Sequence, residues 1–274
     1  MKHKSFIVPH DFTQVATVAL NHAIETSKRV NTTIHILHVV DKQKDVASAT
    51  DKIDEIIAAH NVEGITLTNN VRIGNIFTSI AEFSAEHQAE MIFMGTHGAH
   101  GWQHVVGSNA LRVVTSSPTP FIIVQEKAVK ATGYDSIVVP MDLHKETKQK
   151  LSIVANLAKY FNSKVHVVTP DESDEFLRHQ VRSNITFSES FFKDRGIEMT
   201  SAVVPSSGFD KEVVKYAVSV DADLIAIMNL NRNNLFNALT ASHEQYIITN
   251  DALIPTLIVN PIHLGTDYSN MFSM

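Results

Sequence analysis

The sequence predicts an α/β protein of two tandem, doubly wound domains, each with a five-stranded, mostly parallel sheet. Three observations lead to this fold class: the length, an internal repeat, and the alternation of strand-length apolar runs with amphipathic helical stretches. The chain has 274 residues, more than a typical domain of roughly 150 residues. Hydrophobic residues make up 44% of the chain, which is enough to build packed cores.

The two halves of the chain repeat each other. Residues 5–11, Ser-Phe-Ile-Val-Pro-His-Asp, recur as residues 136–142, Ser-Ile-Val-Val-Pro-Met-Asp. Further matches join residues 33–37 to 164–168, 89–92 to 222–225, and 119–124 to 254–259, at an offset that grows from 131 to 135 through small loop insertions. A repeat of about 130 residues is too long for a solenoid, so each copy needs its own core. We expect one domain over residues 1–128 and another over residues 133–264.

Each copy alternates strands and helices in the manner of βαβ units. The expected strands are residues 5–9, 33–40, 65–72, 90–95 and 120–125 in the first copy, and 136–140, 163–169, 198–204, 222–228 and 255–260 in the second. Thr13 can cap a first helix that carries Lys28 and Arg29 in its last turn. Further helices are expected at residues 51–60, 75–88 and 109–116.

The last strand of each copy, residues 121–124 and 257–259, is apolar and would form an exposed edge. Exposed edges of this kind pair with other strands. We therefore expect the two final strands to cover each other in an intramolecular pseudo-dimer. A homodimer of whole chains is a further possibility.

The composition excludes several classes of protein. The chain has no Cys, so it has no disulfide, thiol nucleophile or thiolate metal site. A net charge of −6 without a Lys/Arg cluster argues against a nucleic-acid partner. No apolar run is long enough for a membrane span or a signal peptide, so the expected location is cytoplasmic, with no membrane partner.

Two segments follow strands at the edge where open parallel sheets bind ligands. Pro9-His10-Asp11 follows the first strand, and a loop over residues 95–108 follows the fourth. That loop holds four of the ten glycines of the chain, and it ends with Gly107-Ser108 at an expected helix N-terminus, where free amides favour phosphate. The alternative is that the loop only turns the chain, that Asp11 forms an Asx-turn or helix cap, and that Ser108 caps the helix.

These residues resemble those of the universal stress proteins, the UspA-like family. Its nucleotide-binding members carry Gly-x2-Gly-x9-Gly-Ser/Thr after strand four, Pro-x-Asp after strand one, and a Leu-His-Val type of ending on strand two. The matching positions are Gly95-Thr-His-Gly98 with Gly107-Ser108, Pro9-His10-Asp11, and Leu37-His38-Val39. The resemblance covers almost the whole chain. It implies a Rossmann-like, adenine nucleotide alpha hydrolase-like fold and a stress-response protein that binds ATP or AMP, with Mg²⁺ as an accompanying ion.

The resemblance also implies roles for individual residues. Pro9 and Asp11 would lie beside the adenosine, and Val39 would meet the adenine edge through its backbone. Gly95 and Gly98 would form the ribose and phosphate turn, and Gly107 and Ser108 would form the phosphate cradle. The side chain of Val39 itself is expected in the core. Eight residues separate Gly98 from Gly107, one fewer than in the family pattern. In the second copy, residues 228–242 contain no glycine, which predicts a degenerate site.

Catalysis is not expected to be efficient. The chain has no Gly-Lys-Ser/Thr phosphate loop. Between Ile53 and Glu126 it has no Lys and only two Arg, Arg72 and Arg112, whereas phosphoryl transfer needs cations on the transferred group. At most, slow ATP hydrolysis is expected. His97, His100 and His104 are weak candidates for metal ligands, and zinc is not expected. Two alternative functions remain: an interaction scaffold that binds no nucleotide, and a histidine-rich, metal-binding stress protein.

Overall fold

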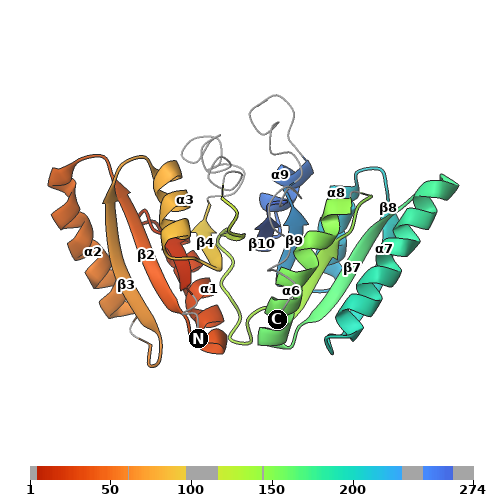
Figure 1. The fold of residues 1–274 in the computed structure, drawn as a ribbon, viewed down its shortest axis with the longest axis horizontal. Coiled ribbons are helices and arrows are strands. Elements are labelled where there is room, and N and C mark those ends of the chain that lie inside the picture. The colour runs from red at the N-terminus through yellow and green to blue at the C-terminus, as the bar shows by residue number, and fades with distance from the viewer. Residues whose placement is uncertain (1–4, 61, 97–116, 144, 230–242, 262–274) are drawn as a thin grey trace.

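The protein forms one ten-stranded sheet flanked by helices (Figure 1). The structure is a computed structural model that describes residues 5–60, 62–96, 117–143, 145–229 and 243–261. The strand order is β3-β2-β1-β4-β5-β10-β9-β6-β7-β8, so each half supplies five neighbouring strands. Within the described residues, no helix combines the length and the apolar composition needed to cross a bilayer.

In the first half the strands fall where the apolar runs predict them. They are β1 (Ser5–Pro9), β2 (Thr33–Val40), β3 (Thr66–Ile73), β4 (Met91–Gly95) and β5 (Phe121–Val124), and the helices are α1 (Gln14–Val30), α2 (Val46–Ala59) and α3 (Ile76–Glu86). Thr13 caps α1 by accepting a hydrogen bond from the Ala16 amide, as expected. The helix predicted from residue 51 begins five residues earlier, after a 3-10 turn over Gln43–Asp45. Only Ala49 and Ile53 of α2 are buried. The first turns of this helix therefore show little helical spacing of apolar residues, and the sequence did not predict its start.

The second half repeats this arrangement. Its strands are β6 (Ser136–Pro140), β7 (Lys164–Asp171), β8 (Met199–Pro205), β9 (Leu224–Met228) and β10 (Thr256–Val259), and its helices are α6 (Lys150–Phe161), α7 (Glu175–Lys193), α8 (Phe209–Ser219) and α9 (His243–Ile248). A 3-10 turn over Lys145–Gln149 precedes α6. In both halves the first strand pairs with the second and fourth in parallel, which gives the doubly wound order predicted from the sequence.

The two halves join through their last strands. β5 and β10 pair antiparallel, with Leu257 opposite Ile122, so the expected pairing of the two final strands is confirmed. All four residues of β5 and all four of β10 are buried. Burial of apolar side chains of this size stabilises by roughly 1.5–3 kcal/mol each, which is a strong reason for the edges to stay covered.

Two apolar cores lie on the two faces of the sheet. On one face, α1, α2, α6 and α7 pack on a cluster that runs across both halves and includes Phe6, Phe93, Val139 and Phe192. On the other face, α3, α8 and α9 pack on a second cluster that includes Ile7, Ile80, Val213 and Ile258. Because both cores continue through the β5–β10 junction, the halves form one packed body.

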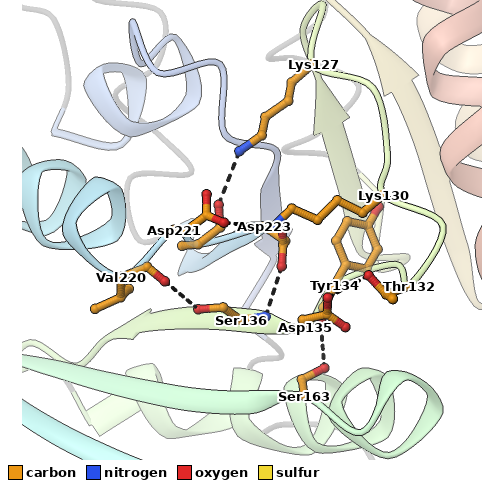
Figure 2. A network of polar contacts seen from close by, with 11 residues as sticks. Lys127, Lys130, Thr132, Tyr134, Asp135, Ser136, Ser163, Val220, Asp221 and Asp223 are labelled. Atoms are coloured by element: carbon orange, nitrogen blue, oxygen red, sulfur yellow. Dashed lines mark hydrogen bonds and ion pairs between the residues drawn. The ribbon is translucent and has the colours of Figure 1, made fainter.

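The connector between the halves is tied down by polar contacts (Figure 2). Lys130 forms ion pairs with Asp221 at 2.9 Å and with Asp223 at 2.8 Å. The second carboxylate oxygen of Asp223 accepts a hydrogen bond from the Ser136 amide at the start of β6. Lys127 donates to the carbonyl of Ala222. These contacts hold the connector against the start of β9, as Figure 2 shows.

Candidate functional site

The candidate site lies at the carboxyl edge of the first half, where β1 separates β2 from β4. From β1 the sheet continues to β2 and β3 on one side, and to β4 and β5 on the other. The order in which the strands are added thus reverses at β1, and this is the switch point at which open α/β sheets bind ligands. The loops after β1 and β4 therefore supply the candidate groups.

Asp11 lies in the loop after β1 and is exposed. Its Oδ1 atom accepts hydrogen bonds from the amide of Thr13 at 3.1 Å and from the Thr13 hydroxyl at 2.5 Å. This is the Asx-turn that the sequence offered as an alternative role, and it positions the cap of α1. Its Oδ2 atom makes no hydrogen bond to any other described residue, so one carboxylate oxygen is available to a ligand.

The site also contains two histidines that the sequence reasoning did not assign to it. His10 is buried, and its Nδ1 atom accepts a hydrogen bond from the Phe12 amide at 3.1 Å. The Nδ1–H of His38 donates to the carbonyl of His10 at 2.6 Å, which joins the ends of β1 and β2. Burial lowers the pKa of His10 from 6.5 to about 4, against the opposing effect of the neighbouring Asp11, so the ring is neutral at pH 7. The position of His10 between Pro9 and Asp11 was the signal available in the sequence.

Phe12 adopts an unusual backbone conformation in the same loop. Its φ is +66°, which is rare for a residue with a large side chain. Its ring lies 4.3 Å from the ring of His38, and the Lys52 ammonium lies 5.1 Å from its centroid. Aromatic and cation–π contacts thus hold the loop after β1 against β2 and α2.

Pro9 and Val39 lie on the strands that border the site. Pro9 ends β1 opposite Leu37 and is buried. Val39 lies in β2, and its half-buried side chain packs against the second core, as expected for that side chain. The structure therefore places Pro9, Asp11 and Val39 at one edge of the sheet.

Gly95 is the last residue of β4, and helix packing accounts for it. A Cβ atom at this position would lie 2.5 Å from the carbonyl oxygen of Val15 and 2.9 Å from the amide nitrogen of Ala16. No other residue type allows the first turn of α1 to approach the end of β4 so closely. The close approach of α1 by itself explains why this position is glycine, and no contact with a ligand is needed to explain it.

The remaining predicted residues of the site lie outside the described part of the chain. They are Gly98, Gly107 and Ser108 of the glycine-rich loop, together with the metal-ligand candidates His97, His100 and His104. Within the described residues, no group of three or more His, Asp or Glu side chains could hold a metal ion.

The equivalent edge of the second half is closed by its own side chains. The side chain of Asn184 on α7 donates to the carbonyl of Asp142 at 2.9 Å, and that of Gln180 donates to the carbonyl of Leu143. The loop after β6 is thereby tied to α7. In the first half, α2 meets the loop after β1 through the Lys52 ammonium, which lies 5.1 Å from the centroid of the Phe12 ring.

A buried lysine further distinguishes the second half. The ammonium of Lys150 donates to the carbonyl of Pro140 at 2.5 Å and to the hydroxyl of Thr147 at 2.8 Å. Burial lowers the pKa of this ammonium to about 8, although Asp142 opposes the shift. The equivalent residue of the first half is Ala19, which is buried in the core. The Lys150 ammonium thus occupies the end of β6, where the first half has only a methyl group.

Comparisons with known proteins match the first half and the overall fold. Residues 2–125 match the family model described as the universal stress protein family. The universal stress protein MJ0531 of Methanocaldococcus jannaschii is 25% identical over 141 residues, which cover 45% of this chain and 83% of that protein.

Two solved structures resemble nearly the whole chain. A universal stress protein from Archaeoglobus fulgidus superposes with a TM-score of 0.75 at 17% identity, over 94% of this chain and 96% of that one. PA1789 of Pseudomonas aeruginosa, a protein described as functionally unknown, superposes with a TM-score of 0.65 at 15% identity, over 94% and 93% of the two chains. At these identities the likeness concerns the fold, which is the tandem arrangement predicted from the repeat.

Proposed function

We propose that this chain, a member of the universal stress protein family, binds an adenine nucleotide, ATP or AMP, at the carboxyl edge of its first half. The observation that carries the proposal is the contrast between the two equivalent edges of the sheet. The first edge keeps an exposed carboxylate, Asp11, with one oxygen free of other described residues. The second edge uses Asn184, Gln180 and Lys150 to bond its own loop and strand end.

The chemistry of the first edge suits a nucleoside. A carboxylate oxygen accepts hydrogen bonds from sugar or base donors, and the neutral ring of His10 adds no charge to the edge. Strand β2 offers backbone groups beside Val39 to a base edge. The glycine-rich sequence of residues 95–108, most of which lies outside the described part of the chain, would supply amides for phosphate binding.

We infer a binding or regulatory role in the stress response rather than efficient catalysis. Phosphoryl transfer needs cations on the transferred group, and Arg72 is paired with Glu86 through both guanidinium nitrogens. If Mg²⁺ accompanies a triphosphate, Asp11 is a carboxylate at this edge that could hold it. Any hydrolysis is expected to be slow.

Calorimetry of the full chain with ATP and AMP tests the proposal. One nucleotide per chain is expected to bind. Gly107→Val should abolish the affinity that depends on phosphate, because a branched side chain at an amide cradle blocks the approach of an anion. Ala241→Val is the matched control, since Ala241 occupies the same position in the second half.

Two results would contradict the proposal. The first is that the parent chain binds neither ATP nor AMP. The second is that Ala241→Val lowers the affinity as much as Gly107→Val does, which would move the site to the second half. Melting curves of both variants check that the fold is retained.

A further inference from the structure

Two histidines of the first half lie in contact, away from the candidate nucleotide site. His35 is the third residue of β2, and His87 directly follows the last residue of α3. The centroids of their rings are 4.5 Å apart, and the ring planes make an angle of 58°. Both residues are half-buried. The pair lies towards the amino edge of the sheet, because His35 comes four positions before Val39 in β2, which is about 13 Å along the strand.

Regular elements hold both histidines in place. His35 lies inside the parallel ladder, with β1 on one side and β3 on the other. The amide of His87 donates to the Phe83 carbonyl at 3.1 Å, and the hydroxyl of Ser5 donates to the His87 carbonyl at 2.9 Å. The end of α3 is thereby tied to the start of β1. The Phe83 ring also stacks on the His87 ring, at 3.9 Å between centroids. The spacing of the two histidines is therefore set by a strand and an anchored helix end.

The hydrogen bonds of the two rings leave the same nitrogen free on each. The Nδ1–H of His87 donates to the Phe83 carbonyl at 3.0 Å, so the Nε2 atom of the neutral ring carries a lone pair. The Nδ1 atom of His35 is hydrogen-bonded to the Thr68 hydroxyl at 2.7 Å. A hydroxyl can donate or accept, so this bond persists when His35 carries its proton on Nδ1 and leaves Nε2 free. Neither Nε2 atom has a hydrogen-bond partner among the described residues, and neither is sealed from solvent.

The charges around the pair are compatible with a bound cation. Burial lowers the pKa of His35 from 6.5 to about 4, and the neighbouring His87 adds to this shift. The ring of His35 is therefore neutral at pH 7, which is the form that binds metal ions. The Arg72 guanidinium lies 4.6 Å from the centroid of the Phe83 ring, but it is hydrogen-bonded to the carboxylate of Glu86. The positive charge on this side of the pair is thus compensated.

The distance between the two rings fits one metal ion. An ion bound at about 2.1 Å to a ring nitrogen lies about 3.2 Å from the centroid of that ring, so two imidazoles on one tetrahedral ion have centroids about 5 Å apart. The observed distance of 4.5 Å is close to this value. Histidines that bind metal ions usually donate their other N–H to a carbonyl or a similar acceptor, as His87 does to Phe83.

The second half has the strand histidine but not the second ring. His166 of β7 takes the place of His35 and is hydrogen-bonded to Thr200 at 2.9 Å. Val220 takes the place of His87, and its carbonyl likewise accepts a hydrogen bond from the serine that begins the first strand of its half. The histidine–threonine bond is therefore common to both halves and needs no metal ion to explain it. The second imidazole is specific to the first half.

We propose that His35 and His87 bind one divalent transition-metal ion, zinc, nickel or copper, through their Nε2 atoms, with water in the remaining positions. Imidazole nitrogens suit these ions, and two protein ligands make a site from which the ion can exchange. The pair is separated by 52 positions in the chain, so no spacing in the sequence indicates it, and the expectation against zinc does not cover it. The site is distinct from the proposed nucleotide site and does not depend on the proposed function.

Calorimetric titration of the full chain with Zn²⁺ tests the inference, with Mg²⁺ as a reference ion that imidazole does not favour. His87→Val introduces the residue that the second half has, and His35→Gln removes the other ring. Each should weaken zinc binding at this site by at least about tenfold, since losing even an outer hydrogen-bond partner of a metal ligand costs that much. His60→Gln is the matched control, because His60 also follows a helix and its Nδ1–H also donates to the carbonyl four positions earlier, at 2.8 Å. It should bind zinc like the parent.

NMR of the chain labelled with ¹⁵N-histidine supplies a readout for each ring. Zinc should shift the Nε2 resonances of His35 and His87 together in the parent, and the shift of His35 should vanish in His87→Val. The inference is overturned if the parent binds no zinc, if either variant binds zinc like the parent, or if the His35 shift persists in His87→Val. Melting curves without metal check that each variant is folded, and either variant alone suffices for the comparison.

Discussion

Acid should destabilise the protein through His22, a buried residue of α1 that contacts the connector between the halves. Its Nε2–H donates to the carbonyl of Lys127 at 3.0 Å, and its Nδ1 atom accepts a hydrogen bond from the hydroxyl of Tyr134 at 2.8 Å. Burial raises the pKa of Tyr134, so that hydroxyl stays protonated and acts as the donor. Both hydrogen bonds use the neutral form of the imidazole.

The size of the stability loss follows from the pKa of His22, which burial lowers from 6.5 to about 4. In this pH range the unfolded chain binds a proton that the folded chain does not. The contribution of His22 to stability is therefore fully present above pH 6.5 and is lost as the pH falls towards 4. At pH 5 the two pKa values correspond to a loss of about 2 kcal/mol from this residue. His10 and His35, whose pKa values burial also lowers to about 4, act in the same direction.

The assay is urea denaturation at pH 7.5 and at pH 5, for the parent and for His22→Gln. The glutamine amide can donate to the Lys127 carbonyl and accept from the Tyr134 hydroxyl, but it does not titrate. The free energy of unfolding of the parent should fall by about 2 kcal/mol more than that of the variant between the two pH values. Equal losses in both proteins would refute the assignment of the acid sensitivity to His22.

Two further predictions concern packing and the junction between the halves. Gly95→Ala should lower the free energy of unfolding by about 2–3 kcal/mol, because its Cβ would lie 2.5 Å from the Val15 carbonyl oxygen. Gly64→Ala is the reference in the same urea titration: its Cβ would meet nothing within 4 Å, but its φ of +80° costs an alanine about 1 kcal/mol of backbone strain. A loss at Gly64 as large as the loss at Gly95 would contradict the packing argument. A fragment of residues 1–130 should dimerise or aggregate, because β5 loses the partner strand that covers its edge. Light scattering checks this, and a soluble, monomeric fragment would show that the edge is protected within its own half.

Much of the fold could be predicted because its signals are local. Apolar runs mark β1 and β2, which begin and end at the expected residues, and Thr13 caps α1 as its sequence position suggests. The pairing of β5 with β10 also followed from local information, since two short apolar strands cannot remain exposed edges. The start of α2 was missed, because its first residues are exposed and show no apolar period.

The duplication, the parallel order of the strands and the edge that carries the candidate site were therefore determined by the sequence alone, through hydrophobic period and repetition. The tertiary structure decided which polar groups are paired. Tyr134 meets His22 across 112 positions, and Gln125 reaches the carbonyl of Asn250 across 125. Those pairings depend on how the halves pack together, and no local pattern records them. The buried hydroxyl of Thr96, which has no hydrogen-bond partner among the residues that the structure describes, likewise depends on the packing of the whole fold.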